Sequence, residues 1–256
     1  MKVHLRPTVS AVVLSTIACG LVIAFPQANA QNPQLVQKVQ EVKQAAAVNK
    51  QALALYTWQE QQVISLKGEV KKTVSYQVSV GPGGQQQKIE LGSTSAPPPS
   101  GGRLKQRIVA KKTNEFQQYG QDVAALVKQY APPDPQLLQR AYGLGNISIQ
   151  LGGAPGTVTL VIKNYIKPGD SMTLVFNEAS KLILSVQVAT YLTDPKDAVT
   201  LAAQYSKLPS GVNYVSSVLV NGVSKQMTVA LKNFNYQLSQ MSYRQSYPER
   251  KSSQAK

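Results

Sequence analysis

Apolar and polar side chains alternate along two long blocks of this chain, and that alternation constrains its fold more than any other feature. The first block covers about 56–91 and the second about 158–236, and each contains several short runs with apolar residues at every second position. A period of two places successive side chains on opposite faces of a strand, so each run has one apolar and one polar face. Such one-sided strands are typical of antiparallel sheets with a single buried face. We therefore expect a large antiparallel sheet that other elements must cover.

Turn residues divide the first block into strands. Lys67-Gly68-Glu69 is expected to form a hairpin turn, and the Gly-Pro-Gly-Gly run at 81–84 to lead into a third strand over 85–91. Residues 93–102 contain three consecutive prolines and two glycines, which exclude a helix and a central strand. We expect an exposed loop there.

The second block has its own turn signals. Asn177–Lys181 is expected to be a tight turn, and Asn221-Gly222 to mark a hairpin between strands over 212–220 and 223–236. Residues 194–197 either extend a strand or begin a helix.

Three segments have helical periodicity instead. Residues 33–55 form an amphipathic helix whose apolar stripe is interrupted by Asn49. Residues 103–130 form a long helix with a weak point at Gly120, and Asp134 caps a short helix over 135–142. The last two make a helical insert over 103–143 between the two blocks of strands.

Residues 1–30 have the pattern of a secretory signal peptide. Lys2 and Arg6 precede an apolar run over 9–25, and Ala28-Asn29-Ala30 supplies a cleavage pattern before Gln31. Cleavage before a lipid-modified Cys19 is the alternative, although residues 16–18 lack the usual large apolar residue. We expect an exported protein, with the periplasm favoured and an outer-membrane lipoprotein or the external medium as alternatives.

Loss of this leader removes His4 and Cys19, the only histidine and the only cysteine. Ser-His-Asp and Cys-His catalysis and zinc sites built from histidine or cysteine are then excluded. We expect no cofactor, no metal and no enzymatic activity. Carboxylates remain, and Glu60 lies on an apolar strand face beside Trp58. Glu60 is expected to pair with an inward lysine or to lie at the edge of a cleft, with a carboxylate-based hydrolase as the less favoured alternative.

The chain is strongly basic, with 27 Lys and Arg against 12 Asp and Glu. This balance attracts anionic partners such as a membrane surface or an envelope polymer, or simply keeps an exported protein soluble. Five cations fall within 103–112, and Arg103, Lys105 and Arg107 are expected to meet an anionic headgroup unless they form a solvated helix face. No basic-aromatic motif for nucleic acid is present.

Aromatic and aliphatic residues of the sheet and the long helix are candidates for the wall of an apolar cavity. Ordinary core packing is the alternative. The expected cavity residues are Trp58, Tyr76, Leu104, Ile108, Phe116, Tyr119, Leu126 and Phe176.

The order of elements over about 33–236 resembles that of the bacterial periplasmic lipoprotein-carrier (LolA/LolB-like) superfamily. A first helix runs into meandering strands, helices follow in mid-chain, and further antiparallel strands close the domain. The resemblance implies a curved, incompletely closed antiparallel sheet whose concave face is covered by helices and holds lipid chains. It rests on architecture, and no site residue is carried over from the family.

We therefore expect one α+β domain over 31–239, with a strongly curved antiparallel sheet of eight or more strands, an incomplete barrel, and helices covering its concave face. Residues 240–256 are expected to be a disordered basic tail. The favoured function is non-enzymatic binding or carriage of a hydrophobic or lipidated ligand, such as a lipid or lipoprotein, under a helical lid. A structural or interaction module of the envelope with a filled core is the alternative.

Overall fold

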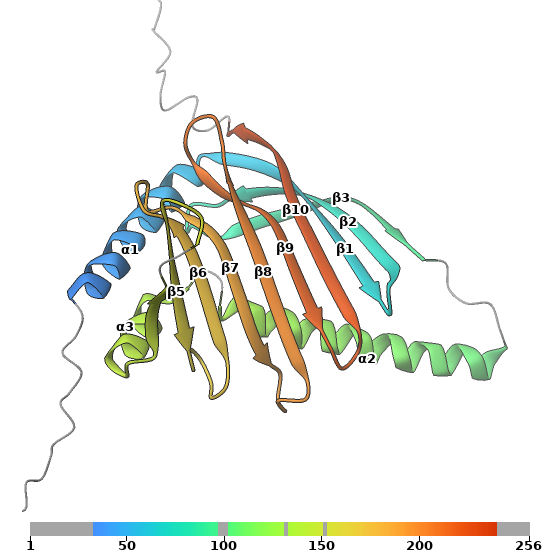
Figure 1. Cartoon of the computed structure of the whole chain (residues 1–256). Coiled ribbons are helices and arrows are strands. Elements are labelled where there is room, and N and C mark those ends of the chain that lie inside the picture. The colour runs from blue at the N-terminus through green and yellow to red at the C-terminus, as the bar shows by residue number, and fades with distance from the viewer. Residues whose placement is uncertain (1–32, 97–101, 131–132, 151–152, 240–256) are drawn as a thin grey trace, which may run out of the picture. The chain divides into compact units, whose positions relative to one another are not determined.

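The computed structural model describes residues 33–96, 102–130, 133–150 and 153–239 (Figure 1). The signal peptide and the basic tail predicted for the two ends of the chain lie outside the described residues. The helices are α1 (Pro33–Leu53), α2 (Arg103–Lys128) and α3 (Pro135–Gly143). The strands are β1 (Tyr56–Leu66), β2 (Glu69–Val80), β3 (Gln86–Ser95), β4 (Ile147–Gln150), β5 (Thr157–Lys163), β6 (Ser171–Asn177), β7 (Ile183–Tyr191), β8 (Ala198–Lys207), β9 (Asn213–Gly222) and β10 (Met227–Leu238).

All ten strands belong to one antiparallel sheet with the order β3-β2-β1-β10-β9-β8-β7-β6-β5-β4. Two meanders, β1–β3 and β4–β10, are joined by the pairing of β1 with β10. The sheet is open, because β3 and β4 are its two edges. The prediction of an open antiparallel sheet with at least eight strands is confirmed.

The connection from β3 to β4 must lead from one edge of the sheet to the other, and α2 has a length that suits this crossing. Nine strand spacings of about 4.8 Å make a sheet about 43 Å wide. A helix of 26 residues is about 39 Å long. The predicted helical insert is therefore the element that returns the chain across the sheet, as Figure 1 shows for α2.

Bulges curve the sheet. A bulge adds a residue to one strand, bends it and increases its twist. Register shifts interrupt the pairing at Thr57/Gln59, Ile64/Ser65, Ser75/Tyr76, Val175/Phe176 and Gln204/Tyr205.

The core lies on one face of the sheet, which we call the α2 face. Cross-strand partners share a face, and Met227 and Gly222, which are partners in β10 and β9, both lie against α2. The same face carries most of the buried residues of β4–β8. The core contains Tyr119, Val123, Leu126, Tyr130, Ala141, Ile147, Val158, Leu160, Ile162, Tyr165, Met172, Leu174, Phe176, Val186, Val188, Val199, Leu201, Ala203, Val220 and Met227.

Asn221-Gly222 is not the hairpin turn that the sequence predicts. Both residues belong to β9, and the turn to β10 lies at 223–226, with Gln226 in the left-handed region at φ 48°. The glycine at 222 is explained by a helix contact described below rather than by turn geometry.

Two further elements differ from the sequence-based expectation. The loop predicted over 93–102 is partly strand, because β3 continues to Ser95 and pairs with Lys72–Val74 of β2. This fits the restriction on proline, since β3 is an edge strand that ends before the first proline. The four-residue strand β4 was not predicted, because it is too short to give a periodic signal.

Candidate functional site

Tyr119 fixes the middle of α2 on the sheet. Its side chain is buried, and its hydroxyl donates to Asp197 Oδ1 at 2.9 Å. A Cβ atom at position 222 would come within 2.5 Å of the Tyr119 hydroxyl oxygen and 2.7 Å of a ring carbon. Only glycine fits beneath the ring. Burial raises the pKa of the Tyr119 hydroxyl, and the hydrogen bond to Asp197 adds to the increase.

The C-terminal end of α2 is held by a buried polar network. The Tyr130 hydroxyl donates to Asp170 Oδ2 at 2.6 Å and lies 2.7 Å from Thr190 Oγ1. Asp170 also accepts the backbone N–H groups of residues 165–167 at 2.5–3.0 Å. Burial, together with the bond to Asp170, raises the pKa of the Tyr130 hydroxyl. Since every polar group named here has a partner, the network holds this end of α2 in one position.

The N-terminal half of α2 is not held in this way. Among its described side chains over 103–118, Val109 and Phe116 are half-buried and all others are exposed. Ile108 is 50% exposed, although it is a large aliphatic residue. Gly102 at the N-cap makes no side-chain cap, and the first turn carries no acidic residue. This half therefore has few contacts and a concentrated positive charge.

Next to the anchored part of α2, the α2 face of β9, β10 and β1 carries an apolar strip of four half-buried residues: Val218, Val229, Leu231 and Ile64. Leu231 pairs with Val218, and Val229 pairs with Ile64, so all four side chains share the α2 face. One row closer to Tyr119, Val199 and Met227, which are the two cross-strand partners of Gly222, are buried. The apolar strip is thus the continuation of the core surface beyond the anchored half of α2.

Beyond the apolar strip lies a cluster of aromatic and polar residues, which we call the Trp58 cluster: Trp58, Glu60, Tyr76, Lys88, Tyr214, Asn233 and Tyr236. Trp58 is 3% exposed and stacks on Tyr236 with ring centroids 5.3 Å apart. The ring centroids of Tyr214 and Tyr236 are 4.4 Å apart. Burial raises the pKa of the Tyr236 hydroxyl, and the nearby Tyr214 and Glu60 raise it further.

Glu60 is buried and paired. Lys88 Nζ lies 2.6 Å from Glu60 Oε1 and 5.7 Å from the centroid of the Tyr76 ring. The prediction that Glu60 pairs with a lysine is confirmed, although Lys88 itself is exposed rather than inward. Glu60 and Lys88 therefore form a part-buried ion pair within the Trp58 cluster.

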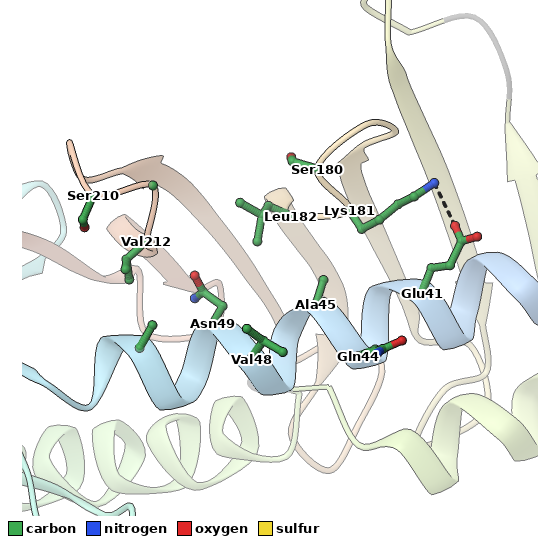
Figure 2. A pocket seen from close by; sticks show the side chains of 12 residues that line it. Glu41, Gln44, Ala45, Val48, Asn49, Ser180, Lys181, Leu182, Ser210 and Val212 are labelled. Carbon is green, nitrogen blue, oxygen red and sulfur yellow. Dashed lines mark ion pairs between the residues drawn. The ribbon is translucent and has the colours of Figure 1, made fainter.

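A separate pocket of about 490 Å³ lies between α1, the β6–β7 turn and the β8–β9 loop (Figure 2). Its α1 wall includes Ala45, Val48 and Asn49, and Glu41 pairs with Lys181 of the turn at 2.8 Å. Asn49 exchanges two 2.7 Å hydrogen bonds with the backbone of Asn213. The residue that interrupts the predicted apolar stripe is therefore the one that fixes α1 to the sheet.

The structure separates the predicted cavity residues into groups. Tyr119, Leu126 and Phe176 are packed in the core. Trp58 and Tyr76 lie in the Trp58 cluster, while Phe116 and Ile108 lie in the weakly held half of α2. The side chains of Leu104 and Lys105 lie outside the described part of the chain, and Arg103 and Arg107 are exposed.

Several residues of these sites were not predicted. Lys88 lies across β2 from β1, and Tyr214, Asn233 and Tyr236 contribute to the Trp58 cluster only because β1 pairs with β10. No sequence signal marks the pairing of the first strand with the last. The residues around the α1 pocket were missed too, although the polar Asn49 in an apolar stripe was a usable signal.

Within the described residues, no helix is both long and apolar enough to span a membrane. The same residues contain no group of three or more His, Cys, Asp or Glu side chains placed to hold a metal ion.

No protein-family model matches the sequence, and no curated protein matches it significantly. Solved structures do match, at low identity. A DUF1329 family protein from Desulfovibrio piger is 9% identical, with 80% of this chain and 93% of that chain covered and a TM-score of 0.39. A LolA superfamily protein from Nitrosomonas europaea is 8% identical, with 76% and 93% covered and a TM-score of 0.29. MucB, in complex with MucA(peri), is 12% identical, with 78% and 93% covered and a TM-score of 0.23. A protein of the superfamily that the order of elements resembles is thus among the structures found.

Proposed function

We propose that this protein is an exported, non-enzymatic binding protein of the bacterial envelope that holds a hydrophobic or lipidated ligand between α2 and the α2 face of the sheet. The apolar strip carries the proposal. Its four aliphatic side chains are only half-buried, whereas the neighbouring row beneath Tyr119 is buried. An apolar chain lying on the strip would remove this surface from water, which stabilises by about 25 cal/mol per Å².

In this mechanism α2 is a helical lid that is fixed by its C-terminal half. Tyr119 and Tyr130 hold that half on the sheet through Asp197 and Asp170. The other half carries Val109 and Phe116, which are half-buried and available to cover the ligand. Glu60 in its pair with Lys88 has no catalytic role in this account.

The affinity for a long-chain fatty acid, measured by displacement of a fluorescent analogue, tests the role of the apolar strip. Val229→Asn places an amide on the strip and should weaken binding about tenfold, since loss of a buried aliphatic contact costs about 1.5 kcal/mol. Ala230→Asn is the matched control, because its side chain lies on the opposite face of the same strand. Ala45→Trp, which fills the pocket beneath α1, should leave binding unchanged. Equal affinities for Val229→Asn and wild type would place the ligand elsewhere.

The cations at the start of α2 are assigned to an anionic membrane surface or headgroup. Each Lys or Arg near such a surface contributes about 1 kcal/mol. Replacing Arg103, Lys105 and Arg107 by alanine should therefore reduce binding to anionic vesicles at least tenfold. Replacing Lys163, Lys196 and Lys207, which are exposed elsewhere, removes the same charge and serves as the control. If the first triple variant binds anionic lipid as well as wild type, the assigned role is wrong.

A further inference from the structure

Trp58 carries a buried hydrogen-bond donor without a partner. Its side chain is 3% exposed, and its indole Nε1–H donates to no acceptor among the described residues. An indole N–H can only donate, and leaving a buried donor unpaired is costly. Polar groups in this position usually meet a water molecule or a ligand atom.

Asn233 supplies a buried acceptor close by. Its Nδ2 donates to the Val215 carbonyl at 2.9 Å, which fixes the amide, while its Oδ1 is buried and accepts from no described residue. Asn233 is the direct cross-strand partner of Glu60, and Trp58 precedes Glu60 by two residues on the same strand face. The unpaired donor of Trp58 and the unpaired acceptor of Asn233 thus lie on the same face of two adjacent strands, β1 and β10.

The charges around this donor and acceptor cancel. The Glu60 carboxylate is paired with Lys88 at 2.6 Å, so neither ion is left to bind a ligand of opposite charge. A charged headgroup would lose its hydration here and gain no unpaired counter-ion. A neutral group that both accepts from Trp58 and donates to Asn233 fits better, and hydroxyl and amide groups do both.

The apolar strip leads away from this site. Glu60 and Leu66 are six residues apart in β1, which is about 20 Å along the strand, and Ile64 lies between them. An amphiphile whose head is bound at Trp58 can therefore lay its chain on the strip toward Tyr119.

We propose that Trp58 and Asn233 recognise the neutral hydroxyl- or amide-bearing head of an amphiphile whose chain lies on the apolar strip. This inference rests on the proposed function and names the head chemistry of its ligand. The aromatic side chains of Tyr236 and Tyr214 form one wall of the site, and the Glu60–Lys88 pair excludes charged heads.

Four twelve-carbon amphiphiles with different heads test this assignment. They are 1-monolauroylglycerol, methyl laurate, laurate and dodecyltrimethylammonium, whose heads are a neutral diol, an ester without a donor, an anion and a cation. Trp58 is the only tryptophan in the chain, so its emission reports on this site alone. We expect 1-monolauroylglycerol to bind about fivefold to tenfold tighter than the other three, as one or two buried hydrogen bonds predict, and to shift the Trp58 emission.

Two variants then separate the head from the chain. Asn233→Leu is measured by fluorescence and Trp58→Phe by calorimetry. Each variant should bind 1-monolauroylglycerol no more tightly than methyl laurate, and its affinity for methyl laurate should equal that of wild type. Gln237→Leu, an exposed amide in the same strand, is the control and should keep the preference. Circular dichroism shows whether each variant is folded. If one of the two is unfolded, the other alone is sufficient for the test.

The outcomes distinguish this inference from the proposed function. If all four amphiphiles bind with equal affinity and both variants behave like wild type, Trp58 is a core residue and the head assignment is wrong, while ligand carriage stands. If laurate binds best, the head is anionic and the assignment is also wrong. If no amphiphile binds, the proposed function itself fails.

Discussion

At the scale of single residues, contacts with α2 restrict which residue can occupy a position in the sheet as much as strand geometry does. Gly222 is the clearest example, because the Tyr119 ring occupies the space where any other side chain would begin. In the sequence, Gly222 follows Asn221, and an Asn-Gly pair usually indicates a hairpin turn. A helix distant in sequence imposes the glycine instead.

Gly222→Ala should therefore destabilise the protein by about 1–3 kcal/mol, since overpacking forces neighbouring groups to shift. Urea unfolding measures the change. Gly92→Ala is the matched control, because it is also in a strand and an added Cβ would meet nothing within 4 Å. If the two variants are equally stable, Tyr119 does not lie against Gly222 in solution.

Tyr165 predicts a pH dependence at the alkaline end. Burial raises its pKa to about 12, although the backbone N–H of Asp134, which donates to its hydroxyl at 2.7 Å, opposes the increase. The folded protein then keeps this proton more tightly than the unfolded chain between pH 10 and about 12. Its contribution to stability is fully present below pH 10 and falls by up to about 1.4 kcal/mol per pH unit above it.

The comparison of wild type with Tyr165→Phe by urea unfolding at several pH values isolates this effect. The phenylalanine variant should lose less stability between pH 10 and 12 than wild type. Tyr56→Phe removes an exposed hydroxyl that meets Ser210 and should retain the wild-type slope. Identical slopes for Tyr165→Phe and wild type would show that Tyr165 is not buried.

At the scale of elements, α2 consists of two unlike halves. The C-terminal half places Tyr119, Val123 and Leu126 in the core, and Tyr130 just after the helix is also buried, whereas the N-terminal half exposes nearly every described side chain. The cations of the first turn, Arg103 and Lys105, lie near the positive end of the helix dipole and make the N-terminal half less stable still. Opening of the lid should therefore begin at this end.

Hydrogen exchange tests this asymmetry. Amides over 106–115 should exchange faster than those over 119–128, because local opening is easiest where few side chains are buried. Addition of a bound amphiphile should slow exchange in the first segment and leave the second unchanged. Equal protection of both segments in the free protein would contradict a lid fixed at one end.

The sequence predicted most elements, since periodicity and turn residues are local signals. The three helices, the Asp134 cap and the Lys67-Gly68 turn all follow from side chains within a few positions of one another. The errors have non-local causes. Position 222 requires glycine because the Tyr119 ring packs against it, and β3 extends to Ser95 because β2 pairs with it.

At the scale of the molecule, the pairing of β1 with β10 produces the candidate site. It brings Glu60 opposite Asn233 and places Ile64 beside Val229. No pattern in the sequence fixes which strands of two meanders will meet, so Asn233 and the apolar strip could not be predicted. Trp58 and Glu60 were singled out because both lie on an apolar face of one strand, a feature that the sequence does record.

The central claim is that the protein carries an apolar ligand, and native mass spectrometry tests it most directly. The protein is purified from a bacterial envelope without detergent, and bound molecules are then identified after lipid extraction. The account predicts a stoichiometric complex with one amphiphile, lost in the Val229→Asn variant and retained in Ala230→Asn. A protein that is free of lipid and also binds none of the added lipids would contradict it and favour an interaction module with a filled core.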